Sequence, residues 1–82
     1  MARLFNREIK VDTDQKENPR FLKRNGSWEG IKNVLEVWKD TGTWWDGEAE
    51  KTFYRVEAAG GSVYEIYLNS GNGKWYLYRI YD

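Results

Sequence analysis

Apolar and polar residues alternate with a period of two along much of the chain, which is the pattern of half-buried β-strands. The alternation is clearest in residues 51–58, 62–69 and 74–81. Two glycine-containing segments, 59–61 and 71–73, separate these runs. Each segment suits a three-residue hairpin loop with glycine in the left-handed position. The second half of the chain therefore predicts a three-stranded antiparallel meander.

The first half of the chain predicts a further strand and a hairpin. Residues 5–12 alternate through Ile9 and Val11, and the polar segment 12–18 that follows is typical of a loop. Asn25-Gly26 lies between two strand-like runs. This dipeptide is the strongest short hairpin signal, because a type I′ turn needs positive φ at both central positions.

Residues 31–38 fit two kinds of structure. Ile31, Val34, Leu35 and Trp38 have the spacing of one helical face. The β-branched residues of this segment, and its direct continuation from a hairpin arm, favour a strand. We expect a bent or bulged strand here, with one short helix as the alternative.

Counting residues from two three-residue loops sets the register of the meander. Val56, Tyr64 and Ile80 would form one row of an apolar face, and the next row would be Tyr54, Ile66 and Tyr78. A slip of one residue would send all of these side chains to the opposite face.

The opposite face of the meander is predicted to carry a charged row. Arg55, Glu65 and Arg79 would lie side by side, and an acid between two arginines favours this register. We expect this face to be the more exposed one, where ion pairs contribute about 0–1 kcal/mol. The predicted neighbours of the row are Phe53, Tyr67 and Leu77 on one side, and Val63 and Tyr81 on the other.

Together these runs predict one all-β domain over residues 1–82. Five to six antiparallel strands would curl into a small, SH3-like or partly open β-barrel. A domain of 82 residues is close to the lower limit for a self-sufficient core, and the chain has no cysteine with which to form disulfides. Five Trp, six Tyr and three Phe are the evident core material.

The charge balance weakens one class of function. Thirteen basic and thirteen acidic residues cancel, whereas a dedicated nucleic-acid-binding domain normally has a positive excess. No stretch approaches the ~20 apolar residues of a membrane span, and no signal-peptide pattern follows Met1. We expect a cytoplasmic protein with no membrane contact.

The chain offers little catalytic or metal-binding chemistry. It has no histidine, which is the commonest general base. It also has no cysteine, which is a usual ligand of structural zinc sites. Asp12-Thr13-Asp14 begins like a calcium loop but lacks the later ligands and the glycine. The segment 71–74 precedes a strand, so it lacks the helix terminus of a phosphate-binding loop. We expect no enzymatic activity, no metal and no cofactor.

Trp44-Trp45 is the sharpest local feature. Adjacent strand residues point to opposite faces, so both rings enter the core only if the backbone bends or both faces are covered. Alternatively, one ring is exposed and joins the aromatic and arginine face as a stacking and cation–π surface. If one Trp ring is exposed in this way, the candidate ligand site consists of Trp44, Trp45, Arg55, Tyr67, Arg79 and Tyr81. If the N-terminal strand and residues 31–38 cover that face instead, the site does not exist.

Motifs along nearly the whole chain resemble those of a family of small, uncharacterised bacterial proteins. These motifs are Phe5…Ile9-x-Val11, Pro19-x-Phe21, Val34-Leu35-x-x-Trp38, Gly42-x-Trp44-Trp45, Tyr54-Arg55-Val56, Tyr64-Glu65-x-Tyr67 and Trp75-Tyr76-Leu77-Tyr78-x-x-Tyr81-Asp82. The second half is also similar to the C-terminal segment of the polymerase-like accessory subunit of bacterial mutagenic-repair cassettes. The resemblance implies a domain without an assigned activity, a DNA-repair context at most, and a role as an interaction module. Lys23 and 27–29 depart from the more aromatic and arginine-rich first hairpin of that family.

The sequence leaves three classes of function open. The first is a non-enzymatic interaction domain that binds another protein, in a DNA repair or replication context, through the aromatic and arginine face or a sheet edge. The second is weak binding of single-stranded nucleic acid through the same face. The third is a small sugar-binding module or hydrolase that uses the Trp pair and the acidic loop 46–50.

Overall fold

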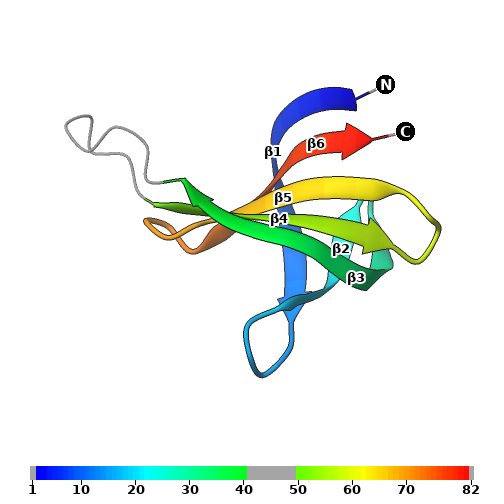
Figure 1. The fold of residues 1–82 in the computed structure, drawn as a ribbon, viewed down its shortest axis with the longest axis horizontal. Helices are drawn as coiled ribbons and strands as arrows, with labels where there is room; N and C mark the ends of the chain where they lie inside the picture. Colours follow the sequence, from blue (N-terminus) through cyan, green and yellow to red (C-terminus); the bar gives the residue numbers. More distant parts are fainter. Residues whose placement is uncertain (1, 41–49, 82) are drawn as a thin grey trace.

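The computed structural model describes the backbone of residues 2–40 and 50–81, and the side chains of 7–40 and 50–81. It is all-β: six antiparallel strands form a small closed barrel, and the described residues contain no helix (Figure 1). The strands are β1 (Ala2–Thr13), β2 (Pro19–Arg24), β3 (Ser27–Asp40), β4 (Lys51–Ala58), β5 (Val63–Asn69) and β6 (Lys74–Tyr81).

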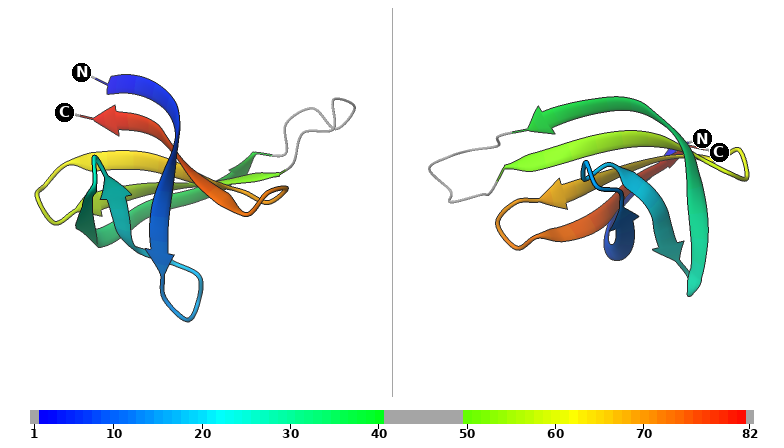
Figure 2. Two further views of the ribbon diagram at one scale, coloured as in Figure 1. Left: turned by 180° about the vertical axis from the view of Figure 1, so that it is seen from behind. Right: turned by 90° about the horizontal axis from the view of Figure 1, so that it is seen from below.

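Two long strands, β1 and β3, turn the sheet into a barrel. The first part of β1 pairs with β6, from Ala2 opposite Tyr81, and its last residues pair with β2. In the same way β3 pairs first with β2 and then, from Ile31 onwards, with β4. Figure 2 shows both strands bending as they pass from one partner to the next. Each strand thus belongs to two sheet segments, which lets a short chain close on itself.

Residues 31–38 form a strand, as the β-branched residues indicated, and the helical alternative is wrong. The register of β3 against β4 shifts between Ile31 and Asn33 and again between Val34 and Glu36. An extra residue at each shift bends and twists a strand. The first shift puts Ile31 and Val34 opposite the core residues Ala58 and Val56, so these two residues share a face despite a spacing of three, whereas Trp38 lies opposite Phe53 on the other face.

The first hairpin has the predicted turn. Arg24 pairs with Ser27, and Asn25 and Gly26 have φ values of 53° and 80°, as a type I′ turn requires. The preceding loop is stabilised by Asp14, whose carboxylate Oδ1 accepts hydrogen bonds from the backbone N–H groups of Lys16 and Asn18 at 2.8 and 2.9 Å. These bonds, first of all the one from Asn18, lower the pKa of Asp14 below its ordinary value.

The predicted register is right for the charged row, for the row of Val56, Tyr64 and Ile80, and for the pairing of β4 with β5, and it is wrong where Ile66 and Tyr67 meet β6. Glu65 pairs with Arg79 and Arg55, but Ile66 pairs with Leu77, where the counting had placed Tyr78. The loop spans 70–73, one residue longer than expected, because Asn69 pairs with Lys74. A compensating shift between Leu77 and Arg79 restores the predicted pairing.

The interior of the barrel is filled by the apolar face of the meander and by residues of β1 and β2. Leu22, Val56 and Ile66 are fully buried there, and Leu77 is in the core instead of on the charged face. The core cluster comprises Ile9, Leu22, Val56, Ala58, Tyr64, Ile66, Trp75, Leu77 and Ile80. Phe53, Tyr67 and Glu65 are also buried, but they lie on the other face of the same strands.

Candidate functional site

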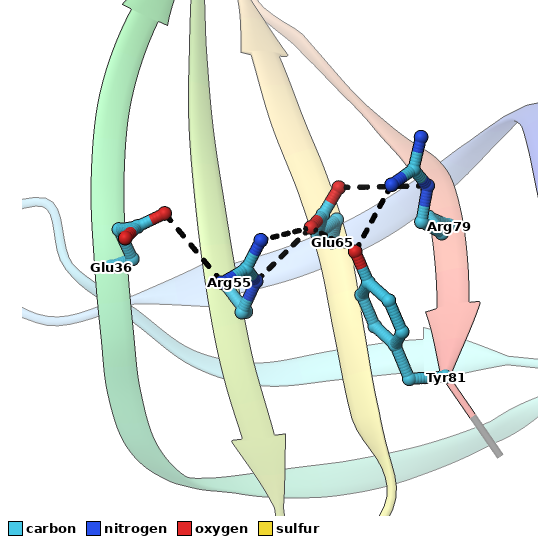
Figure 3. A network of polar contacts seen from close by, with 5 residues as sticks. All are labelled: Glu36, Arg55, Glu65, Arg79 and Tyr81. Carbon is cyan, nitrogen blue, oxygen red and sulfur yellow. Dashed lines mark hydrogen bonds and ion pairs between the residues drawn. The ribbon is translucent and has the colours of Figure 1, made fainter. Parts of the chain in front are cut away.

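The charged row crosses β3 to β6 on the outer face of the barrel and is centred on Glu65. Arg55 on β4 and Arg79 on β6 lie opposite Glu65 in the register. Figure 3 shows the three side chains converging, with Glu36 at one end and Tyr81 beside Arg79. Glu65 is only 2% exposed and is the one buried charged residue in the described part of the chain.

One oxygen of Glu65 accepts most of the contacts. Its Oε2 accepts hydrogen bonds from Nε and Nη2 of Arg55 at 3.1 and 2.9 Å. The Tyr81 hydroxyl donates to the same oxygen at 2.7 Å. A buried carboxylate needs such charge-assisted partners, because burying an unpaired charge costs several kcal/mol. Glu65 is therefore an internal anchor for Arg55 and Tyr81.

Arg79 is held more loosely. Its Nε is buried and lies 3.9 Å from Glu65 Oε1, beyond hydrogen-bond distance, and it has no hydrogen-bond partner among the described residues. Its Nη1 donates to the Tyr81 hydroxyl at 3.1 Å. The third nitrogen of its guanidinium points away from the cluster in Figure 3. Arg79 thus has donors available for a ligand.

The expectation that the whole charged row is exposed is wrong for Glu65. The side chains of Arg55 and Arg79 are 36% and 33% exposed, but that of Glu65 is 3% exposed. The guanidinium groups and the Tyr81 ring lie over the carboxylate. The hydrogen bond to Glu65 raises the pKa of Arg55, and the hydrogen bond to Tyr81 raises the pKa of Arg79.

Next to the charged row, aromatic rings form a ladder across the same four strands. Trp38 stacks on Phe53 with ring centroids 5.4 Å apart, and Phe53 contacts Tyr67 at 5.1 Å. Tyr67 in turn stacks on Tyr76 at 5.0 Å, and the Tyr78 ring meets both Phe53 and Tyr67 edge-on. Phe53 and Tyr67 are buried by their neighbours, whereas the outer rings remain half-exposed.

The arginines join the row to the ladder. The Arg55 guanidinium lies 5.6 Å from the ring centroids of both Trp38 and Tyr81. Arg79 lies 5.6 Å from the Tyr78 ring and 5.8 Å from the Tyr81 ring. Cation–π contacts of this kind restrict a guanidinium without removing it from solvent.

A shallow hollow adjoins Arg55 and Tyr81. It is lined by Arg55, Val63 and Tyr81 and has a volume of about 320 Å³. An open hollow of this kind with an apolar wall and a guanidinium at its rim suits one side chain of a binding partner.

The structure brings together four of the six predicted site residues. Arg55, Arg79 and Tyr81 are linked through Glu65, and Tyr67 lies in the ladder beside them. Tyr67 is 5% exposed, so it supports the surface and offers little of its own area. Trp44 and Trp45 lie outside the described residues.

Sequence reasoning missed the contributions of Trp38 and Tyr78. Trp38 is opposite Phe53, and not opposite Lys51, because of the two register shifts in β3. Tyr78 reaches that face only because it is the extra residue between Leu77 and Arg79. Simple alternation assigns Tyr78 to the core, and a signal for this bulge is not visible in the sequence.

The described residues hold no group of three or more Asp and Glu side chains that could bind a metal ion. No helix long and apolar enough to span a bilayer occurs in residues 2–40 or 50–81.

Comparison with protein-family models places almost the whole chain in one family. The model described as "Domain of unknown function (DUF6504)" matches residues 2–82, and the chain belongs to this family. No curated protein and no solved structure matches the chain.

Proposed function

We propose that this domain of the DUF6504 family is a non-enzymatic interaction module that binds an acidic segment of another protein. The carrying observation is the pair of half-exposed guanidinium groups of Arg55 and Arg79, held over the buried carboxylate of Glu65. In this proposal the partner is a cytoplasmic DNA repair or replication factor, as the sequence resemblance of the second half implies.

The argument rests on pre-organisation. A free arginine loses side-chain entropy when it binds, about 0.5–1.5 kcal/mol for each immobilised side chain. Here Arg55 is already restrained by two hydrogen bonds to Glu65 and by the Trp38 and Tyr81 rings. Arginines and aromatic rings that are fixed in this way are the residues that dominate binding at protein interfaces.

The chemistry of the partner follows from the unused donors. One nitrogen of Arg79 points away from the cluster (Figure 3), and Nη1 of Arg55 lies 3.6 Å from the exposed Glu36. One carboxylate of the partner can replace Glu36 at Arg55 and a second can bind Arg79, while an apolar neighbour fills the hollow beside Val63. Glu36 then acts as an internal substitute for the partner's acid.

Binding of single-stranded nucleic acid at this same face is the weaker alternative. The central rings of the ladder, Phe53 and Tyr67, are buried at 6% and 5% exposure and have no free face for a base. The sugar-binding or hydrolase alternative depends on the Trp pair and the acidic loop, which lie outside the described residues, apart from Glu50.

The test is affinity capture from the native host with mass spectrometry, comparing wild type with Arg79→Gln. Arg79 is chosen because its loss leaves the hydrogen bonds between Arg55 and Glu65 intact. The matched control is Lys74→Gln, which removes an exposed cation that pairs with Glu8 at 3.7 Å. We expect the partner to be lost with Arg79→Gln and retained with Lys74→Gln. A partner retained by both variants, with both folded, would contradict the proposal.

A further inference from the structure

The most exposed aromatic rings of the described residues lie away from this site, on the arm formed by β1, β2 and the start of β3. Trp28 is 53% exposed and Phe21 is 39% exposed. Together with Asp12 they line an open hollow of about 350 Å³. Rings exposed to this degree contribute little to the core, so their presence on one surface calls for a ligand.

The sheet presents the two rings as neighbours. Phe21 pairs with Gly30, and Lys23 pairs with Trp28, so the rings occupy diagonal positions across β2 and β3. Phe21 packs over Gly30: a Cβ atom at this glycine would lie 3.6 Å from an edge carbon of the ring. This packing fixes the Phe21 ring on the sheet before any ligand binds.

Cations surround the rings. The Arg20 guanidinium lies 5.6 Å from the centre of the Phe21 ring, and the Lys23 ammonium 6.0 Å from that of Trp28. Lys10 lies opposite Lys23 on the adjacent strand. The hollow itself holds one carboxylate, Asp12. Glu8 lines the next hollow with Lys10 and Lys23, and Asp14 lines another with Arg20.

We propose that this surface of the first hairpin binds single-stranded nucleic acid. Bases would stack on Trp28 and Phe21, and the phosphates would contact Lys10, Arg20 and Lys23, which is how small β-barrels bind single strands. A cationic peptide is disfavoured because each ring already has a cation beside it. A purely apolar peptide would leave those cations without partners.

Asp12 gives the surface a base preference. A carboxylate beside a stacked base accepts a hydrogen bond from an exocyclic amino group, which cytosine has and thymine lacks. The surface should therefore bind oligo(dC) more tightly than oligo(dT), and Asp12→Asn should reduce the difference.

The experiment measures fluorescence anisotropy of labelled 12-mers of dC and dT at several salt concentrations. Trp28→Ala should weaken binding at least about fivefold, and Trp28→Phe should restore most of the affinity, since it restores a stacking ring. Lys10→Gln should lower the slope of log affinity against log salt by about 0.7. Leu35→Ala, an equally exposed residue on β3, is the matched control and should change nothing.

Three results would overturn the proposal. One is the absence of binding at 50 mM salt by the folded wild type. Another is binding that Arg79→Gln abolishes and Trp28→Ala leaves unchanged, which would assign the nucleic acid to the aromatic and arginine face. The third is equal binding of a labelled poly-glutamate peptide with the same dependence on Trp28, which would show a surface for acidic proteins.

Discussion

Arg79 lies directly opposite Glu65 because Tyr78 occupies the extra position between Leu77 and Arg79. Without this bulge, the longer 70–73 loop would place Tyr78 opposite Glu65. The bulge thus determines two features of the surface: the arginine joins the charged row, and the Tyr78 ring turns outward to meet Phe53 and Tyr67.

Glu65→Gln is expected to lower the free energy of unfolding by about 2 kcal/mol. The amide keeps the shape of the side chain but removes the charge that accepts three hydrogen bonds, and bonds to charged groups contribute about 1.5–3 kcal/mol each. This change in the free energy of unfolding is larger than the one expected for an exposed charged row, because Glu65 is buried. Urea denaturation followed by tryptophan fluorescence measures the change.

The control for that measurement is Glu57→Gln, which alters an exposed carboxylate bonded to the Asn33 side chain at 3.0 Å. We expect a change of about 0.5 kcal/mol or less there. Equal effects of the two substitutions would show that Glu65 is not the anchor of the row.

Trp75→Ala should destabilise the domain more than Trp38→Ala. Trp75 is 9% exposed and packs in the core against Tyr54, and such truncations cost about 3–5 kcal/mol. Trp38 is half-buried on the outer face and contacts mainly Phe53 and Arg55. Thermal melts of the two variants give the order, and Trp28→Ala should melt close to wild type because Trp28 is exposed.

The free energy of unfolding should fall at alkaline pH, because two tyrosines ionise less readily in the folded state than in the unfolded chain. Burial raises the pKa of Tyr54 and of Tyr67 above the ordinary value of 10.0. The unfolded chain therefore releases these phenolic protons first, so their contribution is complete below pH 10 and is lost as pH rises through the folded-state pKa.

The Tyr54→Phe, Tyr67→Phe double variant isolates that contribution. Between pH 9 and pH 11 its free energy of unfolding should fall less than that of wild type. Parallel curves for the two proteins would mean that neither phenol resists ionisation in the fold.

Gly26→Ala should cost about 1 kcal/mol, because its φ of 80° is strained for a residue with a side chain. An added Cβ meets no atom within 4 Å, so the effect comes from the backbone alone. Asn25→Gly at the adjacent turn position should be tolerated, and denaturant melts of both variants test the type I′ turn.

The sequence predicts the strands well because alternation and turn residues are local signals. Asn25-Gly26 defines its hairpin, and the three C-terminal strands lie where the alternation places them. The row of Arg55, Glu65 and Arg79 was found by counting, although two deviations of one residue cancel to produce it. Local patterns do not determine loop length, so the pairing of Ile66 and the position of Tyr78 were wrong.

Burial of the site residues was harder to predict. Glu65 alternates with apolar residues as an outward-facing position does, and nothing local shows that neighbouring strands will cover it. Its burial depends on the large side chains of Arg55, Tyr81 and Arg79, which meet over Glu65 only when β4, β5 and β6 are paired in this register. The exposure of Phe21 and Trp28 is likewise set by which strands pair around them.

The pairing of Ala2 with Tyr81 has a consequence for the order of folding. β1 is the first strand of this barrel to be synthesised, yet one of its two neighbours, β6, is the last strand of the barrel. The barrel can therefore close only after β6 has emerged, and until then β1 exposes an edge with unsatisfied backbone groups. Joining the two ends by a short linker and opening the 59–62 loop would make this contact local, and such a permuted chain would fold faster.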